Sequence, residues 1–165
     1  MVRMEHGYAA IGRAVFAAQR LEIILASIFE IFKMQTNEGY FEETGGYIEV
    51  DRYRRLSVMA VVNELSNKGS ISPELHARLR AFAEDRHTLV HRWMLHNGWP
   101  DDNEAEQWQP LIVLAGRVYR EAMAITHELA AYMVKVGEQS QNDAEADAMN
   151  KRIAQVFNTI GKSSF

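Results

Sequence analysis

Residues 4–34 read MEHGYAAIGRAVFAAQRLEIILASIFEIFKM, and this stretch determines what kind of fold the chain can adopt. Its apolar residues recur at alternating steps of three and four, as one face of an α-helix requires. Further apolar residues widen that face, which is typical of a helix buried on much of its circumference. The sequence therefore predicts one long buried helix over these residues. The expected core positions are Tyr8, Ile11, Val15, Ala18, Leu21, Ile24, Leu25, Ile28, Phe29, Ile31 and Phe32.

Periodicity and end signals predict four more helices, and no segment has the pattern of a strand. Ser72-Pro73-Glu74 places a capping hydroxyl, a proline and an early acid in the order that favours a helix start. Pro110 is expected to open the fourth helix. A chain of this length usually forms one domain. We therefore expect a single all-α domain over residues 1–165, an up-and-down bundle of about five helices with a peripheral last helix. The four later helices are predicted at about 52–67, 72–96, 110–136 and 143–161.

Composition excludes several classes of protein. The chain has 165 residues, 47% of them hydrophobic, and no cysteine. Disulfide scaffolds, zinc ribbons, iron–sulfur sites and thiol nucleophiles are therefore excluded. The start of the chain lacks the apolar run of a signal peptide, and no stretch approaches the ~20 apolar residues of a membrane span. We expect a cytoplasmic protein without a membrane segment.

Charge is distributed unevenly along the chain. The net charge is −4, but residues 52–96 carry eight Lys and Arg against four Asp and Glu, together with four of the six histidines. A local excess of positive charge on a negative body indicates a local anionic ligand rather than a general nucleic-acid coat.

One arginine occupies a position where an apolar residue is expected. The inward face of the third predicted helix is Leu75, Leu79, Phe82, Arg86, Val90 and Trp93. A guanidinium stays charged, and burying it without a partner costs several kcal/mol or so. Glu22 continues the inward series of the first helix and is the candidate partner. Arg86 and Glu22 form either a buried structural pair that sets the helix register or a pair in a cleft where Arg86 also meets an anion.

Histidines accompany this arginine. His87 and His91 lie one turn apart on one flank of the helix, and the reference pKa of histidine, ~6.5, suits proton transfer near neutral pH. Arg86 and His91 diverge by about 140° on an ideal helix. They can share a substrate only in a cleft that wraps the helix or across a twofold dimer axis.

Arg86-x4-His91, with the polar His87 after the arginine, resembles the R-x4–6-H signature of the HEPN superfamily (higher eukaryotes and prokaryotes nucleotide-binding domains). A helical bundle whose long first helix bears an inward acid, here Glu22, is also usual in that family. The resemblance covers the bundle over about residues 4–136, and its specific part is the short motif.

The resemblance implies a metal-independent endoribonuclease that acts as a homodimer, without a cofactor. Arg86 would hold the scissile phosphate, and His91 would act as general acid or base around the ribose 2′-hydroxyl and the leaving 5′-oxygen. Glu22, Asp85 and His87 are supporting candidates. The implied context is toxin–antitoxin or phage defence, with an antitoxin protein as a partner. A catalytically inactive HEPN-like module that binds a nucleotide, RNA or a protein is the alternative.

Two features bear on these alternatives. The toxin subgroup that is paired with a nucleotidyltransferase antitoxin reads R-x4-H-x-Y, whereas this chain has Trp93 at the tyrosine position, so nucleotide attachment to a hydroxyl there is excluded. Glu84-x-x-His87 is half of a di-iron motif, and His87-x3-His91 is a helical two-histidine spacing. No second Glu-x-x-His exists in the chain, and we therefore predict no metal centre.

Overall fold

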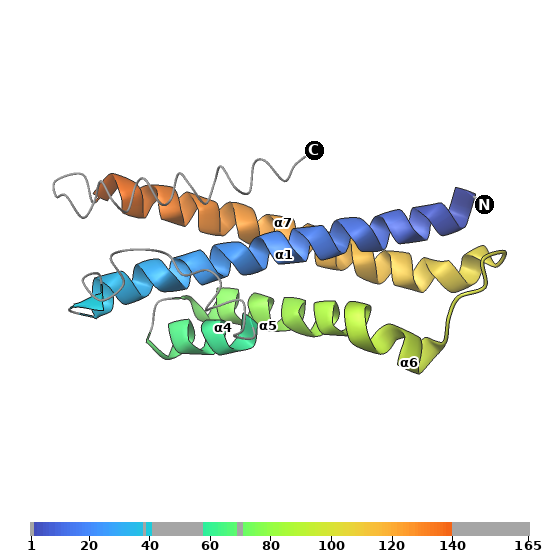
Figure 1. Ribbon diagram of the computed structural model, residues 1–165, viewed down its shortest axis with the longest axis horizontal. Coiled ribbons are helices and arrows are strands. Elements are labelled where there is room, and N and C mark those ends of the chain that lie inside the picture. Colours follow the sequence, from blue (N-terminus) through green and yellow to red (C-terminus); the bar gives the residue numbers. More distant parts are fainter. Residues whose placement is uncertain (1, 38, 41–57, 69–70, 140–165) are drawn as a thin grey trace.

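The computed structural model describes residues 2–37, 39–40, 58–68 and 71–139, and every regular element in these ranges is a helix (Figure 1). The all-α prediction is therefore confirmed for this part of the chain. The predicted helix over residues 143–161 lies outside the described residues, so the count of five helices stays a prediction. The elements are α1 (Val2–Thr36), α4 (Val58–Asn67), α5 (Pro73–His87), the π-helical turn η1 (Thr88–Arg92), α6 (Trp93–Asn97) and α7 (Ala105–Gln139).

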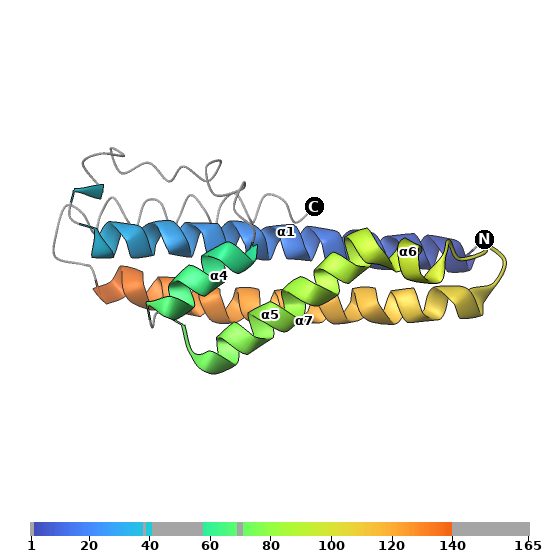
Figure 2. The ribbon, with the colours of Figure 1, turned by 90° about the horizontal axis from the view of Figure 1, so that it is seen from below.

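The two longest helices, α1 and α7, lie side by side and run in the same direction (Figures 1 and 2). Gly7 and Tyr8, near the start of α1, contact Trp108 near the start of α7. The continuous run of α5, η1 and α6 returns in the opposite direction, since Arg78 contacts Glu128 of α7 whereas Trp99, after α6, lies near Tyr8. The shorter α4 packs against α1 and α5.

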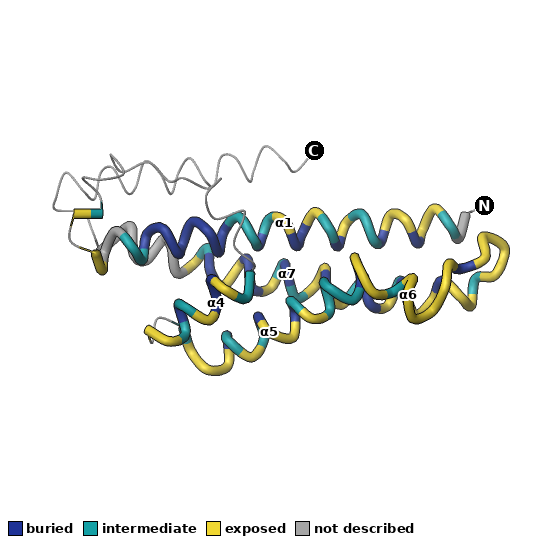
Figure 3. Tube along the Cα trace, turned by 60° about the horizontal axis from the view of Figure 1, so that its bottom comes forward, coloured by how far each residue is buried: buried dark blue, intermediate teal, exposed yellow. Residues whose placement is uncertain are grey.

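The central part of α1 is buried on all sides. Every residue from Ile24 to Ile31 is buried, which Figure 3 shows as a continuous dark stretch. The expectation of a helix buried on much of its circumference is therefore confirmed. Tyr8 is an exception, because 45% of it is exposed and its inclusion in the core was wrong. The ring of Tyr8 contacts those of Trp99 and Trp108 near this end of α1. Tyr8 thus lies on the inner side of the helix, as its spacing predicts, but these contacts do not bury it.

The buried stretch of α1 also contains polar groups with partners. Glu30 is fully buried, and both of its carboxylate oxygens accept the hydroxyl of Tyr40, at 3.1 and 3.0 Å. The hydroxyl of Ser27 donates to the carbonyl of Ile23, one turn earlier. Within the described ranges, none of the helices combines the length and the apolar character needed to cross a membrane.

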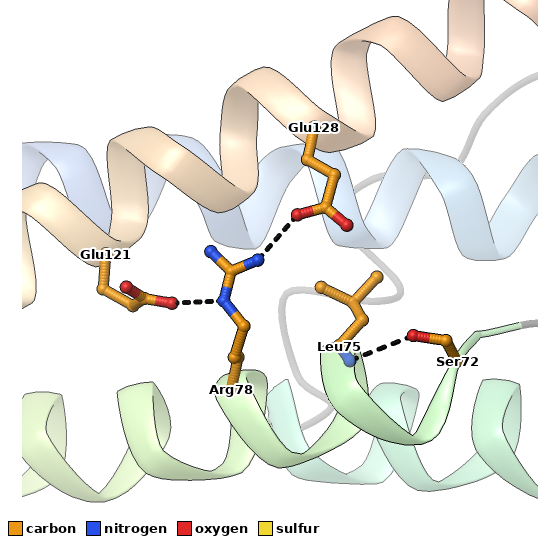
Figure 4. A network of polar contacts seen from close by, with 5 residues as sticks. All are labelled: Ser72, Leu75, Arg78, Glu121 and Glu128. Carbon is orange, nitrogen blue, oxygen red and sulfur yellow. Dashed lines mark hydrogen bonds and ion pairs between the residues drawn. The ribbon is translucent and has the colours of Figure 1, made fainter.

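Helix α5 begins where its sequence predicts. The backbone N–H of Leu75 donates to the hydroxyl of Ser72 at 3.2 Å, and Pro73 is the first helical residue (Figure 4). The cap satisfies one of the backbone donors that a helix start leaves unpaired. At the other end, Gly98 adopts a φ of 73°, and its N–H donates to the carbonyl of Met94. This glycine conformation ends α6 close to the predicted boundary.

A π-helical turn interrupts this helix between α5 and α6. The N–H of Trp93 donates to the carbonyl of Thr88, five residues earlier, instead of four. On an ideal α-helix Leu89 and Val90 lie about equally far from the middle of the inward face, and here Leu89 is buried whereas Val90 is 45% exposed. The prediction that Val90 continues the inward series was therefore wrong. The apolar periodicity of the sequence does not reveal a local change from backbone hydrogen bonds between residues four apart to bonds between residues five apart.

Helix α7 starts five residues before Pro110, so the prediction that this proline opens the helix was wrong. The added first turn is stabilised by Trp108, which is buried and whose Nε1 donates to the carbonyl of Asp101 at 2.9 Å. Pro110 removes one backbone hydrogen bond near the helix start. Burial of the large Trp108 side chain compensates for that loss. Capping residues and proline, the signals that predict a helix start, do not include such burial.

Salt bridges hold α5 against α7 from outside the core. Arg78 lies between two acids of α7, with Nε 2.7 Å from Glu121 and Nη1 2.7 Å from Glu128 (Figure 4). These hydrogen-bonded carboxylates raise the pKa of Arg78 above its ordinary value, with the bond to Glu121 as the largest cause. The charged side chains are partly exposed, so we expect each pair to contribute at most about 1 kcal/mol.

The contact between Gly7 and Trp108 allows a direct test of how closely α1 and α7 pack. A Cβ atom at Gly7 would lie 2.8 Å from Cζ3 of Trp108 and closer still to Cε3, whereas a Cβ at Gly12 would meet nothing within 4 Å. We expect Gly7→Ala to lower the free energy of unfolding by about 1–3 kcal/mol through overpacking. We expect Gly12→Ala to raise it by up to about 1 kcal/mol through helix propensity.

Denaturant unfolding of the two alanine variants measures both effects. Each variant makes the same chemical change on the same helix, so the Gly12 variant is a matched control for the Gly7 variant. Shifts of the same sign in both variants would contradict the close packing of Gly7 on Trp108.

Candidate functional site

The predicted pair between Arg86 and Glu22 is present and links α5 to α1. Nη2 of Arg86 lies 3.0 Å from Oε1 of Glu22, and 34% of the arginine side chain and 29% of the glutamate side chain remain exposed. The pair therefore lies at the edge of the core and not inside it. A guanidinium with one acidic partner and access to solvent can still meet an anion from solution.

The neighbouring residue, Asp85, reaches a different helix. Nε of Arg117 in α7 donates to Oδ2 of Asp85 at 2.5 Å, and Nη2 donates to Oδ1 at 2.6 Å. This two-pronged hydrogen bond raises the pKa of Arg117 above its ordinary value. Asp85 is thus occupied by Arg117 and holds α5 on α7. Sequence reasoning missed Arg117, because it lies 32 residues away on another helix and no local pattern connects the two.

Consecutive residues of α5 therefore bind the two long helices, Asp85 to α7 and Arg86 to α1. Successive residues on a helix point about 100° apart, so a helix that lies over the junction of two others can contact both in this way. The arrangement fixes the rotation of α5 about its axis. Arg86 is therefore positioned by Glu22 from one side and by the neighbouring Asp85–Arg117 pair from the other.

Partial burial changes the acidity of Glu22. Loss of hydration raises the pKa of the Glu22 carboxyl above its ordinary value, and the nearby charge of Arg86 lowers it by less. Removal of the carboxylate from water thus outweighs its attraction to Arg86. The pair is for this reason a poor source of folding stability, as is common for partly buried ion pairs.

His87 and His91 lie together on the exposed side of the helix, as predicted. Their ring centroids are 5.1 Å apart, and the planes are tilted by 49°. His91 is exposed, and His87 is half-buried. The π turn begins two residues after Arg86 and contains His91, and a turn closed by hydrogen bonds five residues apart brings residues at that spacing closer to one face. The two motif residues thus diverge less than on an ideal α-helix.

Glu84, the acidic residue of the half di-iron motif, is paired with an arginine in the structure. Glu84 accepts a hydrogen bond from Nη1 of Arg92 at 3.0 Å, across the π turn. In the described part of the chain, no three or more His, Cys, Asp or Glu side chains are grouped so that they could hold a metal ion.

Aromatic residues border the end of the helix that carries the motif. Trp93 is half-buried and packs against the core. Trp99 is 61% exposed, and its ring centroid lies 6.5 Å from that of Tyr8. Trp108 anchors the loop after α6, whereas Trp99 leaves most of its ring accessible.

We compared the chain with known protein families, curated proteins and solved structures. Neither a family model, nor a curated protein, nor a solved structure matches this chain.

Replacement of Glu22 tests the balance of burial and ion pairing. Because the pKa of Glu22 is raised on folding, the folded chain binds its proton more tightly than the unfolded chain. The contribution of this group to the free energy of unfolding therefore falls as the pH rises from 4.5 through the raised pKa. Glu22→Gln removes that dependence, and we expect the wild type to lose stability relative to the variant over this pH range.

Denaturant unfolding of wild type and Glu22→Gln between pH 4.5 and 7.5 measures the difference. Glu106→Gln, at an exposed position on α7, is the control and should show no such trend. A wild type that gains stability over Glu22→Gln as the pH rises would instead show that attraction to Arg86 dominates.

Proposed function

We propose that this chain is a metal-independent endoribonuclease of the HEPN type, which cleaves RNA as a cytoplasmic homodimer with Arg86 and His91 at the site of reaction. The observation that carries the proposal is the Arg86–Glu22 pair at 3.0 Å, in which the arginine keeps a third of its side chain exposed beside two histidines. We further propose a toxin–antitoxin or phage-defence setting, with an antitoxin protein as partner. This part of the proposal rests only on the resemblance to the HEPN superfamily.

The state of Arg86 supports a role in phosphate binding. A guanidinium presents several N–H donors, and Nη2 of Arg86 lies 3.0 Å from Glu22. No other partner of Arg86 is present in the described part of the chain. The carboxylate can therefore orient the guanidinium while the remaining donors bind phosphate oxygens. Charge that develops on phosphorus oxygens in the transition state would be stabilised in the same way.

The histidines supply the proton transfers that RNA cleavage needs. In the proposed reaction, the imidazole of His91 takes the proton of the ribose 2′-hydroxyl while that oxygen bonds to phosphorus. The bond between phosphorus and the 5′-oxygen breaks, and a protonated imidazole gives its proton to this leaving oxygen. The products are a 2′,3′-cyclic phosphate and a 5′-hydroxyl. His87, with its ring next to that of His91, is a positioning residue in this scheme.

An apolar patch next to the histidines supports the dimer. Val90, Met94 and Leu95 are all exposed, Leu95 by 81%, and they follow the motif along η1 and α6. Exposed apolar residues gathered in one place are typical of association surfaces. A twofold axis through this patch would bring two copies of the Arg86 and His91 site together.

A catalytically inactive HEPN-like module is the second candidate. It is favoured by the ion pairs of Asp85 and Arg86, which link α5 to both long helices and so give both residues a structural role. In that case the surface around Arg86 binds a nucleotide, RNA or a protein without cleavage.

Cleavage of single-stranded RNA by the full chain in EDTA distinguishes the two candidates. If the chain is the proposed nuclease, the wild type cuts RNA, and Arg86→Ala and His91→Ala each reduce the rate by about 100-fold or more. Arg86→Lys should also be impaired, because lysine keeps the charge without the planar fork of donors.

Arg80→Ala and His96→Ala are matched controls, because both residues are exposed and lie on the same helical run. Helical circular dichroism confirms that each variant is folded. RNA binding without cleavage by the folded wild type would support the inactive module. Full activity of Arg86→Ala would contradict the proposal that Arg86 binds the phosphate and stabilises charge in the transition state.

A further inference from the structure

We infer that His87 and His91 form a two-ligand site for a divalent transition-metal ion such as Zn²⁺. This site is distinct from a catalytic metal centre, because it offers only two protein ligands and leaves the other coordination positions to water. The inference itself does not depend on RNA cleavage. Only its consequence for activity rests on the proposed function.

The spacing of the two rings matches that of two imidazoles on one ion. With Zn–N bonds of about 2.0–2.1 Å and a tetrahedral angle at the metal, the ring centres lie roughly 5 Å apart. The observed centroid separation of His87 and His91 is 5.1 Å. The separation of the two ring centres therefore fits shared coordination, and binding requires ring orientations that direct one nitrogen of each imidazole at the ion.

Both imidazoles are available for coordination. No hydrogen bond or ion pair engages either ring in the described residues, and His91 is exposed to solvent. The pair is carried by one helical run rather than by loops, so binding a metal orders little additional chain. Imidazole nitrogen favours Zn²⁺, Ni²⁺ and Cu²⁺, whereas Mg²⁺ prefers oxygen ligands.

The charges around the pair do not exclude a cation. Arg86 and Arg92 flank the two histidines in sequence, but each has an acidic partner, Glu22 for Arg86 and Glu84 for Arg92. The local positive charge is thus largely neutralised. The Arg92–Glu84 pair also spans the π turn and links its two sides.

A bound ion would occupy the imidazole nitrogens that proton transfer requires. On the proposed function, Zn²⁺ therefore inhibits RNA cleavage and EDTA restores it. A catalytic metal predicts the opposite response to EDTA. Because metal ions and protons compete for the same nitrogens, binding should weaken as the pH falls from 8 to 6.

Calorimetric titration of the full chain with Zn²⁺ or Ni²⁺, without RNA, tests the site. We expect binding to the wild type, no binding of Mg²⁺, and a loss of affinity of at least about tenfold in His87→Ala and in His91→Ala, since each removes one arm of a chelate. His96→Ala, which removes an exposed histidine of α6, is the matched control and should bind as the wild type does.

Thermal unfolding with and without Zn²⁺ provides a second readout, because a ligand of the folded state raises the melting temperature. Zn²⁺ affinity and thermal shift that are unchanged in both His87→Ala and His91→Ala would overturn the inference. Absence of RNA cleavage would overturn only the proposed function, since metal binding is measured independently.

Discussion

Small buried residues on the inner face of α1, among them Gly7, Ala14 and Ala18, let this helix lie close to α7. At Gly7 the approach leaves no room for even one methyl group beside Trp108. The position of α7 along α1 is set by this contact, and α5 packs across both helices. The geometry of the candidate site depends on how α1 and α7 are placed against each other. Glu22 of α1 and Arg117 of α7 are the partners of Arg86 and Asp85 in α5.

The site is therefore built from side chains of three helices, although its chemical groups are concentrated on one. Asp85 binds α7, Arg86 binds α1, and the π turn that follows presents His91 to solvent. Burial weakens the ion pair of Glu22, so its presence is better explained by orientation of Arg86 than by stability. The helix thus carries a positioned and partly exposed guanidinium, and the rings of His87 and His91 lie next to each other on the same helical run.

Local chemistry is why much of the site was predictable. Arg86 stands in an apolar series and Glu22 in another, and opposite charges at such positions must meet or remain near water. His87 and His91 are one turn apart on the same helix, so their proximity follows from helical geometry. Arg117 was not predictable in its role, because its partner Asp85 is distant in sequence and is brought close only by packing.

By itself the sequence determined the helical class, the start of α5 at Ser72 and the buried centre of α1, because periodicity and capping act within a few residues. The tertiary structure decided three things that these local rules missed. Helix α7 begins five residues before Pro110 with Trp108 buried, Leu89 and not Val90 lies in the core, and Tyr8 near the start of α1 is exposed. Trp108 packs on Gly7 and Tyr8, which lie far away along the chain, and a rule that reads only neighbouring residues does not include such contacts.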